Sequence, residues 1–205
     1  ASGSYEDKLV MEGDLSIDGG HLTGWYNTSR DSSKMVLDLN GHTFTTHGSW
    51  WMMPDMTVEG PGTFIWDNGA GFEFAVIYTS DPCFWTTPVF DSDVTLKGIG
   101  PIQAHGATVP NLTSIGELVL FHGGITISGD LNVDHQVVFL VGPHIIEGDV
   151  LVKAADPNAG LYTASGVGQG LYLKGDIIDT NTEQNGLYNA SKLRFVGGGN
   201  EQTLD

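Results

Sequence analysis

Basic residues are scarce in this chain. Only 8 Lys and Arg stand against 25 Asp and Glu, which gives a net charge of −17 at pH 7. Nucleic-acid binding needs Lys and Arg to neutralise phosphates, so we expect no nucleic-acid partner. The same charge opposes docking on an anionic lipid surface. Repulsion between copies keeps such a protein soluble unless salt or divalent cations screen the charge.

Cysteine and long apolar runs are also scarce. Cys83 is the single cysteine, so no internal disulfide can form, and no Cys/His spacing of a zinc site occurs. No apolar run reaches the length of about 18 residues that a membrane-spanning helix needs, so we expect no membrane insertion. Apolar residues at helical spacing are missing too, and no helix is expected.

Glycine is abundant instead, with 29 residues, while charged residues make up only 16% of the chain. An ordinary globular domain has about a quarter of its residues charged. Apolar residues reach 40%, which is enough for a hydrophobic core. Much glycine, little charge and many Thr, Ser and Asn residues favour an all-β protein with many turns.

A nine-residue pattern recurs, in which apolar and polar residues alternate around a central glycine, as in HIIEGDVLV. The central glycines are Gly13, Gly41, Gly60, Gly98, Gly129, Gly148, Gly175 and Gly197. Two residues before them stand Met11, Leu39, Val58, Leu96, Ile127, Ile146, Leu173 and Phe195. All of these are apolar, and four residues before the glycine only His144 is polar. The alternation predicts strands with one buried face.

The spacing of the glycines predicts the fold. Successive glycines lie about 19–31 residues apart, with one double interval, and this is the length of one coil of a β-solenoid. We therefore predict an all-β, single-stranded parallel β-solenoid (β-helix) with irregular coils. An antiparallel β-sandwich or jelly roll is the alternative, since it also alternates strands and turns. Residues 1–122 should form aromatic-rich coils with long loops and residues 123–205 more regular coils, within one continuous domain.

Two early segments resemble known coils. MVLDLNGHTFTT (Met35–Thr46), followed by MTVEGPGTFIWDN (Met56–Asn68), is similar to coils of right-handed parallel β-helices of the pectin-lyase-like type. Such coils occur in bacteriophage tailspikes and fibres and in polysaccharide-degrading enzymes. The stretch from Gly123 to Asp205, with KLRFVGGGNEQTL near its end, resembles looser repeats of bacterial surface and phage structural proteins. The resemblance is one of repeat style and implies a fold rather than an activity.

Aspartates are the main candidates for catalysis or metal binding. Glycoside cleavage needs two carboxylates about 5–9 Å apart, and Asp91 with Asp93 fits if both leave one strand on the same side. Asp130, Asp149 and Asp176 each follow a repeat glycine, and stacking would align their charges, which calcium could relieve. Asp beside Gly is common in turns, where the carboxylate accepts backbone N–H groups. We therefore predict no catalytic residue and no cofactor, with calcium at this column as the weak alternative.

Histidines and sequons point to no further chemistry. The histidines, His42 and His47 among them, lack metal-binding spacing, and we interpret them as surface or turn residues, although these two could approach each other across a bend. The glycosylation sequons at Asn27, Asn111 and Asn189 occur about as often as chance allows.

The five tryptophans all precede residue 86. The candidates for binding a partner or a glycan are Trp25, Tyr26, Trp50, Trp51 and Trp85. Neighbouring strand residues face opposite sides, so one of Trp50 and Trp51 should be exposed or meet another subunit. Exposed aromatic residues suit a glycan platform or a subunit interface, and a hydrophobic cap over the first coils is the third reading.

These features predict a non-enzymatic structural protein of a virion or an extracellular surface, such as a phage fibre, spike or decoration protein. Its expected partner is itself, as a trimer or an end-to-end stack, with other virion or surface proteins or glycans as further possibilities. The alternatives are a subunit of an extracellular β-solenoid filament and a polysaccharide-binding or polysaccharide-cleaving β-helix protein.

Overall fold

The structure is a computed structural model that describes residues 6–22, 34–52, 56–67, 72–74, 89–104, 106–121, 124–140, 142–153, 160–163, 170–180 and 193–196. Within these ranges every secondary-structure element is a β-strand, as the alternating sequence pattern predicts. The described residues contain no helix that is long and apolar enough to span a membrane.

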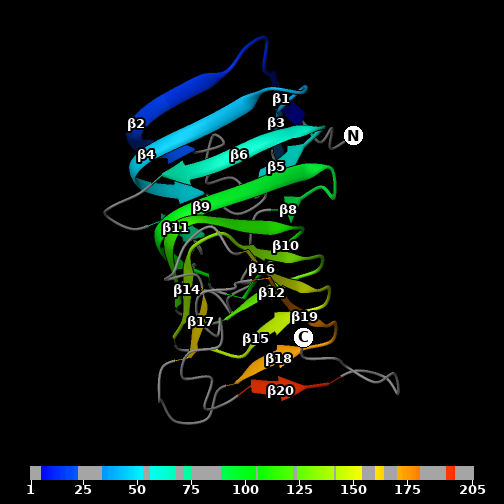
Figure 1. The fold of residues 1–205 in the computed structure, drawn as a ribbon. Coiled ribbons are helices and arrows are strands. Elements are labelled where there is room, and N and C mark those ends of the chain that lie inside the picture. The colour runs from blue at the N-terminus through cyan, green and yellow to red at the C-terminus, as the bar shows by residue number, and fades with distance from the viewer. Residues whose placement is uncertain are drawn as a thin grey trace, which may run out of the picture.

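The strands form three sheets, and the strands within each sheet are parallel. The strands follow each other along the stack in chain order, from blue to red in Figure 1. The four-stranded sheet consists of β1 (Glu6–Val10), β3 (Lys34–Asp38), β5 (Met56–Glu59) and β8 (Val89–Phe90). The five-stranded sheet consists of β10 (Ala107–Val109), β12 (Ile125–Ile127), β15 (His144–Ile146), β18 (Leu171–Leu173) and β20 (Leu193–Phe195). β10 lies next to β8, so these two sheets follow each other along the stack.

The third sheet has 11 strands and lies opposite the other two. Its main path consists of β2 (Leu15–Leu22), β4 (Thr43–Met52), β6 (Gly62–Asp67), β9 (Val94–Gln103), β11 (Leu112–Phe121), β13 (Leu131–Val133), β16 (Val150–Val152) and β19 (Ile177–Asp179). Beside this path lie β7 (Phe72–Phe74), β14 (Gln136–Phe139) and β17 (Gly160–Thr163). The chain thus repeats one layer, in which a strand of a smaller sheet is followed by a corner turn and a strand of the large sheet.

Every described strand pair is parallel, and at many inward positions apolar residues stack on apolar residues. Leu37 pairs with Val58, and Phe44 pairs with Phe64. The Phe44 and Phe64 rings lie 5.3 Å apart, centroid to centroid, and both side chains are buried. Burying one such side chain contributes about 1.5–3 kcal/mol, so these apolar columns stabilise the stack. The alternative antiparallel sandwich is wrong, because its strands would pair in the opposite sense.

The predicted inward positions are largely confirmed. The residues two before the repeat glycine are at most 5% exposed from Met11 to Leu173, while the Phe195 side chain lies outside the described part. Four residues before the glycine, Leu9 is an exception, because it is 50% exposed although it has the inward parity. Its exposure arises from its place in the first layer, where no described strand lies on the outer side of β1.

Gly98 and Gly60 differ from the other repeat glycines in where they lie. Gly98 is not at a corner, because β9 runs straight through it, and a Cβ atom there would overlap the buried Trp66 ring. Gly60 is shifted, because Glu59 pairs with Asp38 and this sets Gly60 opposite Leu39 rather than opposite Gly41. Gly197 lies outside the described residues.

The corners that the glycine pattern missed contain no glycine. β8 and β9 are joined by residues 91–93, and β10 and β11 by Pro110 and Asn111. Asp, Asn and Pro form turns as readily as glycine does, so these layers show no central glycine in the sequence. Hydrogen bonding crosses residue 122, since β12 pairs with β10 and β13 with β11. The division at residue 122 stays a prediction.

Candidate functional site

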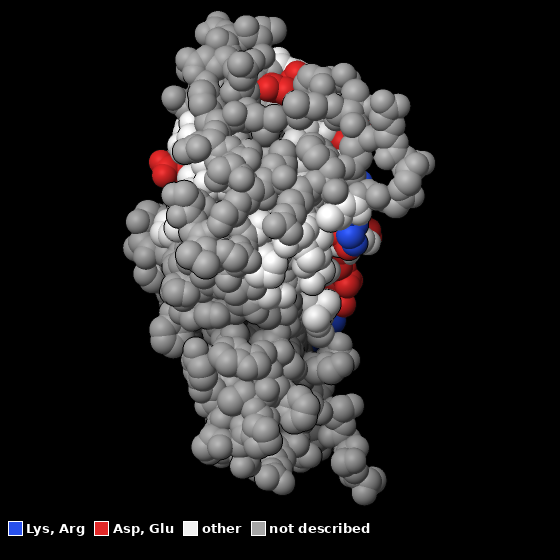
Figure 2. Space-filling model, turned by 90° about the horizontal axis from the view of Figure 1, so that it is seen from below, with Lys and Arg blue, Asp and Glu red and all other residues white. Residues whose placement is uncertain are grey.

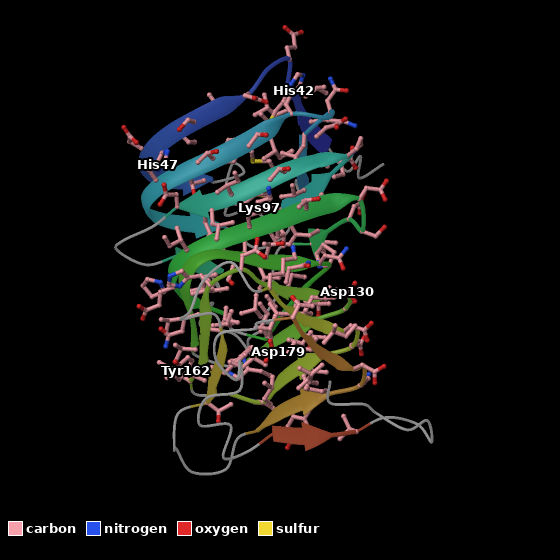
Figure 3. The ribbon with its side chains drawn as sticks, viewed as in Figure 1. His42, His47, Lys97, Asp130, Tyr162 and Asp179 are labelled. Carbon is pink, nitrogen blue, oxygen red and sulfur yellow. The ribbon has the colours of Figure 1, made fainter. Side chains whose placement is uncertain are left out.

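Asp and Asn side chains connect successive corners in a ladder of hydrogen bonds. The backbone N–H of Asp130 donates to Oδ1 of Asn111 over 2.7 Å. The N–H of Asp149 donates to Oδ1 of Asp130 over 2.8 Å, and the N–H of Asp176 donates to Oδ1 of Asp149 over 2.9 Å. Each side chain thereby fixes the corner of the next layer. Figure 3 shows Asp130 at the edge of the stack where the corners lie.

The ladder explains why glycine stands before these aspartates. A Cβ atom on Gly129 would overlap Oδ1 of Asn111, and one on Gly148 would overlap Oδ1 of Asp130. A Cβ atom on Gly175 would lie 2.5 Å from Oδ1 of Asp149. None of these three glycines has a positive φ, so close approach of the layer above is what requires glycine there.

The aspartates of the predicted calcium column therefore form hydrogen bonds that hold the corners together. Asp130 and Asp149 each commit one carboxylate oxygen to a backbone N–H. In the described part of the chain, no group of three or more His, Cys, Asp or Glu residues is placed to hold a metal ion. A bound calcium at Asp130, Asp149 and Asp176 stays a prediction of the sequence.

Asp91 and Asp93 lie in a turn rather than on one strand, so the expected geometry is wrong. The backbone N–H of Val94 donates to the Asp91 carbonyl over 3.1 Å and closes this turn. The Ser92 hydroxyl donates to Oδ1 of Asp93 over 3.4 Å, and both aspartates are exposed. A turn does not fix the parallel side-chain directions that the proposed carboxylate pair requires.

Ion pairs connect layers along the same side. Lys8 contacts the carboxylate of Glu59 and lies 2.9 Å from Oδ2 of Asp38, and Lys174 contacts the carboxylate of Glu147. Hydrogen bonds to Glu59 and Asp38 raise the pKa of Lys8, and the bond from Lys8 lowers the pKa of Asp38. Figure 2 shows acidic and basic side chains together along one edge of the molecule. Exposed pairs of this kind contribute little stability each.

A second polar group, formed by Ser16, His47 and Asp67, lies on the outer face of the large sheet. Nε2 of His47 is 3.0 Å from Oγ of Ser16, and Nδ1 of His47 is 3.2 Å from Oδ2 of Asp67. These distances match the bonding order of a Ser-His-Asp hydrolase triad. A triad also needs preorganised oxyanion donors in a water-excluded site, whereas the His47 and Asp67 side chains are 40% and 51% exposed. The arrangement connects β2, β4 and β6 on an exposed face of the sheet.

His42 and His47 do not approach each other. His42 lies at the corner before β4, with its Nδ1 atom 3.6 Å from Oδ1 of Asp14. His47 lies within β4, and Figure 3 shows the two residues at separate places on the stack. The expected encounter across a bend is wrong, because β4 runs straight between them.

His144 is the one predicted inward position that carries a polar side chain. It pairs with Leu171 and is only 1% exposed. Nε2–H donates to the Leu140 carbonyl over 3.1 Å, the ring packs edge-on against Phe139, and Nδ1 bonds no described group. Burial lowers the pKa of His144, so the imidazole is neutral in the core.

The aromatic candidates are only partly placed. Trp50 and Trp51 lie in β4, where they pair with Phe72 and Glu73 of β7, but their side chains lie outside the described part. Trp25, Tyr26 and Trp85 lie outside the described residues. Their assignment as partner or glycan sites stays a prediction.

The first layer, formed by β1 and β2, lies at the blue end of the stack in Figure 1. Leu9 is 50% and Leu15 is 42% exposed, whereas their pairing partners Leu37 and Phe44 are 0% and 1% exposed. Sequence reasoning missed this exposure, because the pattern gives each copy the same buried face and does not show which copy lies at the end of the described stack.

No protein-family model, no curated protein and no solved structure matched this chain.

Proposed function

We propose that the chain is a parallel β-solenoid, in which each layer is one coil around a shared apolar core. The parallel pairing of every described strand supports this, as does the order of strands, which alternates between the smaller sheets and the large sheet. The corner ladder adds a hydrogen-bonded column that runs along the stacking axis. The more detailed likeness to pectin-lyase-like coils belongs to this proposal as well.

We further propose that the protein is a non-enzymatic structural component of a virion or an extracellular surface that associates with itself. The observation that carries this is the exposure of Leu9 on β1 and Leu15 on β2, whose pairing partners Leu37 and Phe44 in the next layer are buried. Natural proteins protect open strand edges or use them for pairing. Leu9 and Leu15 would each gain a share of the about 1.5–3 kcal/mol that full burial of a leucine contributes.

Charge sets the conditions for this association. The net charge of −17 makes copies repel each other at low ionic strength, and added salt screens that repulsion. Association through apolar side chains should therefore strengthen with ionic strength. Association through ion pairs would weaken under the same change.

Sedimentation velocity over a range of protein concentrations, in low salt and in about 0.5 M salt, tests this role. We expect a monomer at low concentration and low salt, and a defined oligomer or an end-to-end stack as either is raised. A chain that stays monomeric at every concentration and at both salt levels would overturn the proposed function.

A further inference from the structure

The corner between β3 and β4 contains an Asn-Gly pair, Asn40-Gly41, a dipeptide prone to lose ammonia because glycine has no side chain to hinder attack by its nitrogen. Both residues are exposed, and both have a positive φ, 48° at Asn40 and 83° at Gly41. The N–H of His42 donates to the Leu39 carbonyl over 2.8 Å and closes the turn. Asn-Gly pairs favour this turn conformation. Dipeptide and exposure alone therefore predict a fast reaction.

The two groups that would react are each held by a neighbouring layer. Loss of ammonia begins when the backbone nitrogen of Gly41 attacks Cγ of Asn40, and Nδ2 is the leaving group. Nδ2–H donates to the Met11 carbonyl over 3.0 Å, and the Gly41 N–H donates to the Pro61 carbonyl. Met11 lies directly after β1, and Pro61 lies in the turn between β5 and β6. The two acceptors thus belong to the layers on either side of the corner.

We propose that Asn40 is a deamidation site that contact with the neighbouring layers keeps closed. While both hydrogen bonds persist, the Gly41 nitrogen is directed toward Pro61 and the carboxamide toward Met11, so the nitrogen does not reach Cγ. When the layers separate locally at this corner, both groups are released and the reaction proceeds. The rate of ammonia loss at Asn40 then reports how often the corner opens.

Water is the only other reactant. The Gly41 nitrogen forms a bond to Cγ of Asn40 and the Cγ–Nδ2 bond breaks, so that Nδ2 leaves as ammonia with the proton from the Gly41 N–H. Water then opens the resulting five-membered imide. Cleavage between the nitrogen and Cγ gives aspartate, and cleavage between the nitrogen and the backbone carbonyl carbon of residue 40 gives isoaspartate.

Either product prevents the corner from closing as it did before. An aspartate has no side-chain N–H to donate to Met11, and it adds a second carboxylate beside Asp38, whose Oδ1 accepts the Asn40 backbone N–H over 2.9 Å. Isoaspartate lengthens the backbone of the turn and displaces Gly41 from Pro61. A chain that has opened at this corner is therefore marked permanently, and its attachment between β1 and β3 is weakened.

Mass spectrometry of folded and urea-unfolded protein in mildly alkaline buffer tests the site. Asn68-Gly69 and Asn185-Gly186 are the same dipeptide, so unfolded chains should lose ammonia at similar rates at all three positions. In the folded protein, Asn40 should react about tenfold or more slowly than in the unfolded chain. Equal rates at Asn40 in the two states would overturn the proposal, as would an unfolded chain in which Asn40 stays intact.

Lys8→Met changes the layer contacts and leaves the dipeptide intact. Lys8 contacts Glu59 and lies 2.9 Å from Oδ2 of Asp38, so it connects β1 with β3 and β5. Its loss should speed modification of Asn40 in the folded protein about twofold to fivefold, with no change in urea. Lys174→Met removes an ion pair of a later layer and is the matched control, which should leave the rate at Asn40 unchanged. Equal acceleration by both variants would contradict control by this corner.

Asn40→Asp reproduces one product and tests its consequence. The backbone N–H of Met11 donates to the Asp38 carbonyl over 2.9 Å, so its hydrogen exchange measures attachment of the two layers. Exchange at Met11 should be about threefold to tenfold faster in the variant than in the wild type, because the bond from the carboxamide is lost. Unchanged exchange would overturn the inference that modification weakens this attachment.

Discussion

Oδ1 of Asp130 accepts the backbone N–H of Asp149 over 2.8 Å and lies where any side chain on Gly148 would have to go. One aspartate thus holds the next corner through a hydrogen bond. Its Oδ1 atom also leaves no room for a side chain larger than that of glycine at the position beneath it. The same relationship connects Asn111 with Gly129, and Asp149 with Gly175. The repeated Gly-Asp pair is therefore a structural unit of the stack.

Asp130→Ala should destabilise the chain by about 1–3 kcal/mol, because the Asp149 N–H, which lies in a partly buried corner, loses its acceptor. Asp130→Asn keeps an Oδ1 acceptor, as Asn111 does one layer earlier, and should stay close to wild-type stability. Urea denaturation of both variants measures the difference. An equal loss for the Ala and Asn variants would show that the carboxylate charge matters rather than the hydrogen bond.

Gly148→Ala should cost about 1–3 kcal/mol, because the new methyl group overlaps Oδ1 of Asp130. Gly13→Ala is the matched control, since it places the same methyl group in open space and should cost little or nothing. Thermal melting of the two monomeric variants compares them. Similar losses for both would mean that corner conformation, rather than close approach, selects glycine.

His144 should make stability depend on pH. Burial lowers its pKa in the folded state, while the unfolded value is about 6.5. Below about 6.5 the unfolded chain binds more protons, so the free energy of unfolding falls as pH drops through the folded pKa, and it is unaffected above this window. His144→Leu should stabilise the chain more at pH 5 than at pH 8, as measured by denaturant midpoints. An unchanged pH profile in this variant would contradict the assignment.

Ser16 should behave as an ordinary serine. Its hydrogen bond to His47 lies on an exposed sheet face, where water competes for every developing charge. We expect no covalent labelling by a fluorophosphonate probe and no difference between the wild type and Ser16→Ala in ester hydrolysis. Labelling that depends on both Ser16 and His47 would instead reveal a nucleophilic site and contradict the non-enzymatic role.

The sequence predicted the strands well because burial alternates with a period of two. Leu39, Ile127 and Leu173 are buried as the pattern requires. It failed where corners use other residues, as at Asp91 and Asn111, since several residue types form the same turn. The contact between Ser16 and His47 spans 31 residues of sequence and depends on strand register, which the pattern leaves open.

Electron microscopy of the concentrated protein in salt tests the central claim most directly. A self-associating parallel solenoid predicts straight particles made of whole numbers of subunits, with strands spaced about 4.8 Å apart along the particle axis. Single subunits that remain separate at every concentration, or strands running along the particle axis, would contradict the account.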